Sequence, residues 1–380
     1  MIGLASLFAL LVVLAAPHTA AAATCTNEIS GPNDPGYAGA ERNFPSPETW
    51  NAEEWPLFDC IPQTAPSASD SEGAAGMSAN RAWAAYGMGH VTVAYMEGGV
   101  NWKLPDANDL RDQAYLNTGE LPYPEDGEGH THGTYDLNGD GVLNVEDYAH
   151  DPRVGRANPQ AGGITPEDLI IAFGHCQIKN HLLGQCPAGG QFDNDKNGYP
   201  NDISGWNFHR DTNDPQTDNT IYHHANGEQE TLVATANNKF GGVGVCPGCR
   251  LLSVKMGDEA IDRPDRVAEG IVFAVKAGAK VIDVTSAALG QTPSMLGAVE
   301  YAYKHGVVIA WASNDFESAD HTEGMRFPHV WPGNSVVSDQ SNRNGTSLPT
   351  DVTATTFRSR SSLTSYGAHA LFSVDRKSVV

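Results

Sequence analysis

Basic residues are scarce in this chain. Its 380 residues include 23 lysines and arginines against 46 aspartates and glutamates, so the formal net charge is −23. A chain this acidic repels phosphate groups, which argues against nucleic acids and anionic membrane surfaces as partners. Hydrophobic residues still make up 40% of the chain. This is enough for a large core, so the composition excludes a disordered polymer.

Long apolar runs are also rare. The one such run lies within residues 1–23, has no lysine or arginine before it, and ends in small residues. This pattern is typical of a signal peptide, and the run is too short for a secure membrane span. We therefore expect a secreted, extracellular protein without a membrane span. A lipid anchor on Cys25 is the alternative, although Thr24 in front of it fits that motif poorly.

Cysteines are few, and their number is even. An even set in an exported chain predicts disulfides, and pairing of near neighbours is the simplest hypothesis. The six cysteines would then pair as Cys25–Cys60, Cys176–Cys186 and Cys246–Cys249. The third pair also has the CxxC spacing of redox or zinc sites. A single CxxC without a second ligand pair is weak for metal and favours a structural disulfide.

The sequence divides into an arm and a domain. Residues 24–78 are rich in proline, serine, asparagine, glycine and glutamate without periodicity, which predicts an extended arm. Regular structure begins at Ser78, a suitable helix N-cap, so the domain is expected over residues 79–380. Within it, residues 103–220 are polar and poorly periodic and predict an insertion of loops.

Strand and helix patterns alternate through the rest of the domain. The apolar spacing predicts strands over 91–96, 250–256, 280–285 and 306–312, and helices over 78–86, 266–277 and 294–305. Such alternation indicates βαβ units, and hence an α/β fold with a parallel sheet and helices on both faces. Functional groups in this architecture lie at the carboxyl ends of the strands.

The residues around three strand ends resemble one protein family. Glu97 follows VTVAYM, Asn314 follows VVIAWAS, and ALGQ follows VIDVT. These strands, the segment from His224 to Met256 and the later FRSRSSLTSYGAHALFSV resemble, in order and spacing, the subtilisin-like serine proteases (subtilases, peptidase family S8). The resemblance covers residues 79–374. It implies a subtilisin-like fold from a divergent, secreted bacterial branch, with a calcium-loop insertion.

The resemblance also implies catalytic roles. Glu97 stands at the carboxylate position, His224 at the position of the base, and Asn314 at the oxyanion amide. In such a site the histidine takes a proton from a serine hydroxyl, the carboxylate holds the histidine, and the amide stabilises the oxyanion. The implied function is peptide-bond hydrolysis by a secreted serine endopeptidase, monomeric and acting on polypeptides.

Several motif positions depart from the family pattern. Glu97 replaces the aspartate, which moves the carboxylate by on the order of 1 Å. Ala225 and Asn226 replace the glycine and threonine after the histidine, and residues 286–291 disturb the usual Ser-Leu-Gly-Gly. The Gly-Thr-Ser-Met-Ala helix that carries the family's nucleophile is not found before Val380. We therefore expect the chain as printed to be truncated or degenerate and to show no turnover.

Two short motifs imitate the catalytic ones. Gly345-Thr346-Ser347 spells the nucleophile tripeptide, but it precedes the SYGAH segment and leads into Leu-Pro. It is therefore not expected to carry the nucleophile. His132-Gly133-Thr134 spells the base motif but runs into a loop, whereas His224 is followed by the matching helix and strand. His224 is therefore the preferred base.

Two acidic loops in the insertion indicate calcium. The first has the ligand spacing of an EF-hand-type loop, with glycine at position six and aspartate at position twelve. The second begins in the same way but has no carboxylate at position twelve. The predicted metal ligands are Asp136, Asn138, Asp140, Val142 and Asp147 in the first loop, and Asp193, Asp195, Asn197, Tyr199 and Asp202 in the second. A solvated turn is the alternative for each loop.

Two other functions stay open at this point. The altered motif positions also fit a catalytically inactive homologue that binds extracellular peptides or proteins in the same cleft. The acidic loops also fit a calcium-stabilised structural surface module. A Gly-Thr-Ser helix would favour the protease, and an intact cleft without a nucleophile would favour the binding module. Folding that requires calcium, without peptide binding, would favour the structural module.

Overall fold

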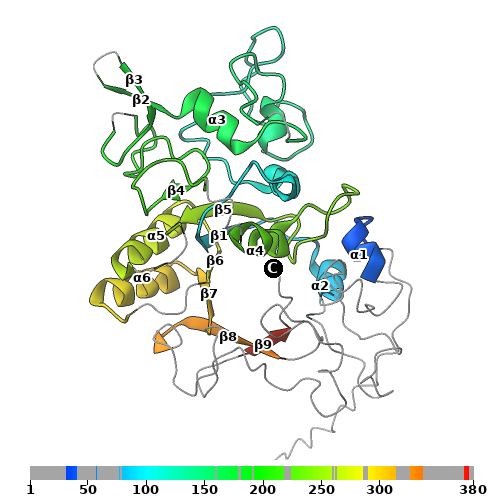
Figure 1. Cartoon of the computed structure of the whole chain (residues 1–380), viewed down its shortest axis with the longest axis vertical. Helices are drawn as coiled ribbons and strands as arrows, with labels where there is room; N and C mark the ends of the chain where they lie inside the picture. The colour runs from blue at the N-terminus through cyan, green and yellow to red at the C-terminus, as the bar shows by residue number, and fades with distance from the viewer. Residues whose placement is uncertain are drawn as a thin grey trace, which may run out of the picture.

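A parallel β-sheet forms the centre of the molecule (Figure 1). The computed structural model describes residues 31–40, 57, 77, 79–158, 161–178, 181–190, 192–217, 224–258, 261, 263–285, 290–313, 326–336 and 372–375. In these residues seven strands form one sheet in the order β4-β5-β1-β6-β7-β8-β9, and every neighbouring pair is parallel. The strands are β1 (Thr92–Glu97), β4 (Trp206–Asn207), β5 (Arg250–Lys255), β6 (Val281–Val284), β7 (Val308–Ala312), β8 (Val330–Val336) and β9 (Phe372–Asp375).

Helices and a small hairpin complete the described part of the chain. The α-helices are α1 (Pro35–Ala40), α2 (Ala79–Tyr86), α3 (Pro166–Phe173), α4 (His224–Val233), α5 (Pro264–Lys276) and α6 (Pro293–Lys304). Three short 3₁₀ helices are η2 (Pro105–Asp109), η3 (Arg111–Gln113) and η4 (Val145–Tyr148). Strands β2 (His175–Ile178) and β3 (His181–Gln185) form an antiparallel hairpin. None of the helices described is long and apolar enough to cross a membrane.

Both faces of the sheet are covered by helices, as the sequence predicts. Successive side chains of a strand point to opposite faces. On β1, Met96 belongs to the large apolar core that also contains residues of α5 and α6. Its neighbour Tyr95 belongs to a second apolar cluster that contains Ala225 and Val233 of α4. The α/β class with helices on both faces is therefore confirmed.

The predicted strands and helices of the central fold are also found. The apolar runs form β1, β5, β6 and β7, and the helical spacings form α2, α5 and α6. Strand β8, which reads VWPGNSV, is not predicted by the sequence pattern. Its Pro332 lacks a backbone N–H and its Gly333 weakens strand preference, so local pattern argues against a strand there. The pairing of β8 between β7 and β9 stabilises it nevertheless.

The insertion contains short helices and strands in addition to its loops. In Figure 1, α3 and the hairpin β2–β3 lie together in the upper part of the view, beyond the edge of the sheet formed by β4 and β5. Helix α3 begins with a capping box, in which the Asp168 carboxylate accepts from the backbone N–H of Thr165 at 2.7 Å. The segment also has an apolar cluster of its own, which includes Leu121, Tyr148 and Leu169. This cluster gives the polar, poorly periodic segment a core.

Two of the three predicted disulfides are present. Cys176 in β2 is bonded to Cys186, which follows β3, and Cys246 is bonded to Cys249 immediately before β5. The CxxC pair is therefore a structural bridge. Cys25 and Cys60 lie outside the described residues, as do residues 1–23 and the expected N-cap.

Candidate active site and metal loops

The end of β1 meets the start of α4. Glu97 is the last residue of β1 and His224 is the first residue of α4. A carboxylate oxygen of Glu97 lies 3.9 Å from Nδ1 of His224, and the two side chains are 8% and 37% exposed. The other Glu97 oxygen accepts a hydrogen bond from the backbone N–H of Gly98. The structure thus brings together the two residues that the sequence predicted as carboxylate and base.

Amide side chains fasten α4 to the loop that follows β1. Asn226 is 1% exposed. Its side chain accepts from the backbone N–H of Asn101 at 2.8 Å and donates to the Asn101 carbonyl at 3.2 Å. Gln229 donates to the carbonyl of Gly99 at 3.0 Å. These bonds fix the first turns of α4 against the end of β1, which holds His224 beside Glu97. They also give Asn226, a departure from the family pattern, a structural role.

A second carboxylate contacts the histidine, and sequence reasoning missed it. Glu228 lies one turn after His224 on α4, and its Oε1 is 3.2 Å from Nε2 of His224. The other Glu228 oxygen accepts a hydrogen bond from the hydroxyl of Tyr95, which is 1% exposed. Burial, followed by the charges of Glu228 and Glu97, raises the pKa of Tyr95 well above its usual value. The i,i+4 spacing on a predicted helix was the signal that could have identified Glu228.

Asp283 adds a third carboxyl group to this region. It lies on β6 directly beside Tyr95 in the register of the two strands. Burial, with a smaller contribution from the charge of Glu228, raises the pKa of Asp283 to about 7. An aspartate within the apolar strand VIDV was the sequence signal for this group.

The remaining predicted catalytic positions have different outcomes. Asn314 lies outside the described residues, and so do residues 286–289 and 345–347. His132 lies on an exposed turn of the insertion, where its Nε2 is 2.9 Å from a carboxylate oxygen of Asp126. His132 therefore pairs with its own turn and is not the partner of Glu97, in agreement with the preference for His224.

The second acidic loop gathers carboxylates from two distant segments. Oxygens of Glu120, Asp193 and Asp195 all lie within 4.8 Å of one another. Glu120 is 4% exposed and accepts from the backbone N–H groups of the loop, including that of Asn194 at 2.7 Å. Sequence reasoning missed Glu120 because it lies far from the loop in the chain. No local motif signals such a contact.

Asp202 lies at the base of the same loop. It is completely buried and accepts hydrogen bonds from the side-chain amides of Asn117 at 2.8 Å and Asn197 at 3.0 Å. Burial above all, with the charges of Asp195 and Glu120, raises the pKa of Asp202 to about 8. The three close carboxylates Glu120, Asp193 and Asp195 repel one another, and a calcium ion bound to their oxygens would offset that repulsion. The donor set therefore fits a hard divalent cation.

The backbone of the second loop favours this arrangement. The Asp193 carboxylate accepts from the N–H groups of Asn197 at 3.0 Å and Gly198 at 2.9 Å. Gly119 allows the close approach of the two segments, because a Cβ there would lie 2.7 Å from the Cβ of Asp195. Tyr199 contributes no side-chain oxygen to the cluster, since its ring packs against aromatic residues. Only its backbone carbonyl could serve as the predicted ligand.

The first acidic loop is folded but less concentrated in charge. The Asp136 carboxylate accepts from the N–H groups of Gly139 at 2.8 Å and Gly141 at 3.0 Å. Asp147 is 2% exposed, and its two oxygens accept from Leu137 and from Asn144, which places it in the capping box of η4. Its carboxylate thus closes the loop on itself. In the described part of the chain, the group of three close carboxylates belongs to the second loop.

The arm and the loop after α4 form another carboxylate-rich contact. Asp34 is fully buried and accepts from the backbone N–H groups of residues 237–239 at 2.6 to 3.1 Å. Nearby, the amide of Asn238 donates to Asp109 at 2.5 Å. Burial raises the pKa of Asp109 to about 7. The arm is therefore anchored to the domain at this point.

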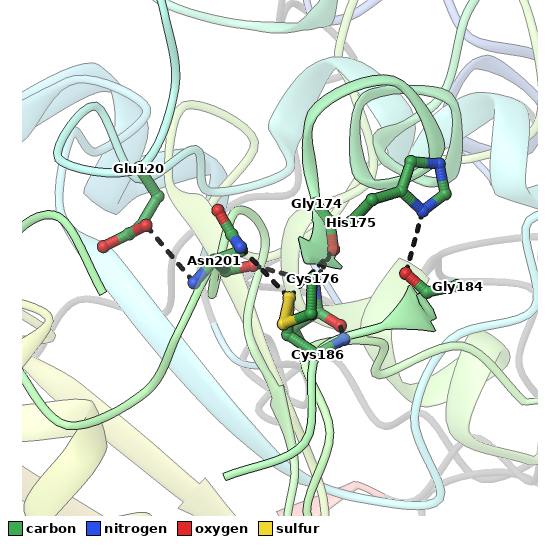
Figure 2. Close-up of a disulfide and its surroundings, with 8 residues drawn as sticks. Glu120, Gly174, His175, Cys176, Gly184, Cys186 and Asn201 are labelled. Carbon is green, nitrogen blue, oxygen red and sulfur yellow. Dashed lines mark hydrogen bonds between the residues drawn. A yellow bond between two sulfur atoms is a disulfide. The ribbon is translucent and has the colours of Figure 1, made fainter. Parts of the chain in front are cut away.

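A disulfide supports the second acidic loop. Figure 2 shows Asn201 between Glu120 and the Cys176–Cys186 bridge. The N–H of Asn201 donates to Glu120 at 3.2 Å, and its side-chain amide donates to Sγ of Cys186 at 3.1 Å. Asn213 adds a bond from its amide to the carbonyl of Asn201 at 3.1 Å. The bridge therefore holds the backbone that positions Glu120.

Glu97 lies at the end of a central parallel strand, and His224 lies at the start of the helix that covers it. The protein is therefore an α/β protein with an acid–imidazole pair at the edge of its sheet. The model of the subtilase family, Peptidase_S8, matches residues 89–374. This is more than half of the chain, so the chain belongs to the subtilase family, as the sequence predicted. Subtilases are a family of serine proteases.

Curated relatives agree with this assignment. The major intracellular serine protease of Bacillus subtilis (strain 168) is 27% identical over 168 residues, which is 43% of this chain and 46% of that protein. Thermitase of Thermoactinomyces vulgaris is 32% identical over 114 residues, which is 30% of this chain and 40% of thermitase. Among solved structures, a protease of Pseudoalteromonas arctica PAMC 21717 covers 91% of this chain and 72% of its own, at 16% identity and a TM-score of 0.44. The chain spans less than half the length of these curated relatives.

Proposed function

We propose that this protein is a secreted endopeptidase of the serine type, degenerate or truncated in the printed chain, in which Glu97 and His224 stand as carboxylate and base and Asn314 as the oxyanion donor. No nucleophilic serine is assigned among the printed residues. The approach of Glu97 to Nδ1 of His224, within a subtilase domain, carries the proposal. A carboxylate at Nδ1 holds the imidazole in the tautomer whose Nε2 can take a proton from a serine hydroxyl. Polypeptides are the substrate class that this chemistry serves.

With a serine hydroxyl at Nε2 of His224, Glu97 and His224 would form a slow catalytic pair. Glutamate in place of the family's aspartate leaves the carboxylate 3.9 Å from Nδ1, longer than a hydrogen bond. A catalytic group that lies about 1 Å from its productive position costs about 100-fold in rate. The hydrogen bond from Gly98 to the other oxygen holds Glu97 in this position.

A second candidate function is binding of peptides without cleavage. The observation that favours it is the contact of Glu228 with Nε2 of His224, at 3.2 Å. This is the nitrogen that a serine hydroxyl would need. In this alternative the same cleft holds an extracellular peptide or protein, and the imidazole serves as a binding group.

Calcium and secretion complete the proposal. We propose that calcium binds at the second acidic loop, with Glu120 added to the ligands that the sequence predicted, and that the first loop is a further calcium site. Export is supported by the two disulfides, since such bonds form and persist in oxidising compartments. A structural role for calcium does not compete with the endopeptidase, because the acidic loops and the acid–imidazole pair are separate groups.

Hydrolysis and binding of an unfolded protein test the proposal. Wild-type protein and His224→Ala would be incubated with fluorescein-labelled casein in calcium, with release of small peptides and anisotropy of the uncleaved label measured together. Release that is lost in His224→Ala supports the endopeptidase. Casein binding without release supports the binding module. Equal release from both proteins overturns the assignment of His224 as the base.

A further inference from the structure

His224 has a carboxylate at each ring nitrogen. Glu97 faces Nδ1 at 3.9 Å, and Glu228 faces Nε2 at 3.2 Å. The nearer partner is therefore Glu228, which belongs to the same helix as the histidine. The ring is held between the end of β1 and the next turn of α4.

Glu228 is itself held in place. Its second oxygen accepts the hydrogen bond of the Tyr95 hydroxyl, and Tyr95 is 1% exposed within β1. Burial keeps this phenol in its protonated, donating form, because it raises the pKa of Tyr95. The helix that carries Glu228 is fastened to the loop after β1 by Asn226 and Gln229. The contact with His224 is thus supported by buried groups, while the two paired side chains are themselves partly exposed, at 37% and 33%.

This contact has a chemical consequence for a serine-type mechanism. A carboxylate only accepts hydrogen bonds, so the contact is favourable when Nε2 of His224 carries a hydrogen and directs it at Glu228. A general base needs the lone pair of the same nitrogen. Proton transfer from a serine hydroxyl therefore requires the contact between Glu228 and His224 to break first.

We propose that Glu228 is a positioning residue that binds Nε2 of His224 and competes with the nucleophile's hydroxyl for that nitrogen, while Tyr95 fixes Glu228. The catalytic consequence rests on the proposed endopeptidase function, but the contact itself can be measured without activity. The charged and titratable groups that face it are Glu97 and Tyr95 from β1 and Asp283 from β6.

Diethylpyrocarbonate measures the availability of the imidazole. The reagent acylates an imidazole nitrogen that has a free lone pair, and peptide mass spectrometry resolves the rate at each histidine. Glu228→Gln should raise the rate at His224 by about two- to fivefold, the range expected from the strength of a partly exposed ion pair. Tyr95→Phe should also raise the acylation rate at His224, because this substitution removes the hydrogen bond to Glu228 while preserving the aromatic ring.

A second histidine–carboxylate pair, His329 and Glu300, provides the control. Glu300 lies 3.5 Å from Nε2 of His329, whose side chain is 36% exposed, close to the 37% of His224. Glu300→Gln should accelerate acylation at His329 and leave the rate at His224 unchanged. Glu228→Gln should accelerate acylation at His224 and leave the rate at His329 unchanged. An unchanged rate at His224 in Glu228→Gln overturns the proposal.

Activity distinguishes this proposal from the proposed function. If casein is hydrolysed, Glu228→Gln should raise kcat/KM at neutral pH by about the same two- to fivefold factor, and a lower value overturns the competition. If no casein is hydrolysed but acylation of His224 accelerates, the contact stands and the endopeptidase function fails.

Discussion

Without calcium, the stability of the protein should fall as pH rises, because of a buried carboxyl group in the second acidic loop. The responsible group is Asp202, whose pKa is raised from 3.8 to about 8 in the folded protein, chiefly by burial. Between these two values the folded state keeps a proton that the unfolded state has lost. Folding therefore takes up a proton, and stability falls with rising pH across this window and levels off above it.

The magnitude follows from the size of the shift. Each pH unit within the window costs about 1.36 kcal/mol, so Asp202 alone should lower the free energy of unfolding by about 4 kcal/mol between pH 5 and pH 8. Asp109 and Asp283, whose pKa values are also raised, act in the same direction. Calcium should remove this dependence, because its charge favours ionised carboxylates. Calcium at 100 times its dissociation constant should add about 2.7 kcal/mol of stability.

The assay is urea unfolding in EDTA and in calcium at pH 5 and pH 8. Asp202→Asn isolates the contribution of this carboxyl from those of other buried acids. The variant loses one acceptor for Asn117 or Asn197 and should be about 1 kcal/mol less stable at pH 5. In EDTA at pH 8, however, it should be more stable than the wild type. A wild-type protein that is equally stable at both pH values in EDTA would refute the reasoning.

Three further predictions test the fold and the support of the acidic loop. Replacing Cys176 and Cys186 by serine should lower the free energy of unfolding by about 3 kcal/mol and weaken calcium binding in calorimetry; unchanged calcium affinity would contradict the link through Asn201. Ile271→Ala, in the core, should cost about 2–5 kcal/mol in urea unfolding, whereas Ile171→Ala, at a side chain 45% exposed, should cost far less. Gly205→Ala should destabilise strongly in the same assay, because φ is +109° and a Cβ would collide with the carbonyl of Ser253.

The central fold could be predicted because its signals are local. Apolar runs such as VTVAYM and RLLSVK form buried parallel strands whose side chains pack on both faces, and no distant residue is needed to recognise them. Disulfides at short separations are favoured by proximity, which explains the confirmed pairs Cys176–Cys186 and Cys246–Cys249. β8 could not be predicted, since its pairing with β7 and β9 outweighs the local effect of Pro332.

The candidate site could be predicted only in part. Glu97 and His224 were placed by their positions at a strand end and a helix start, and the structure brings them together. Glu120 was missed because its contact with the acidic loop joins segments more than 70 residues apart, as its bond to Asn194 shows. Asp283 was missed because only the packing of β6 beside Tyr95 reveals its proximity to Glu228.

The most direct test of the account is covalent labelling of a nucleophilic serine. The protein would be treated with a fluorophosphonate probe in calcium, and the modified residue would be located by mass spectrometry in the wild type and in His224→Ala. We predict no labelled serine in either protein, because the printed sequence lacks the Gly-Thr-Ser-Met-Ala helix that supplies the nucleophile in the family and so presents no hydroxyl to Nε2 of His224. A serine that is labelled in the wild type and not in His224→Ala would contradict the account, because it would show an active nucleophile among the printed residues.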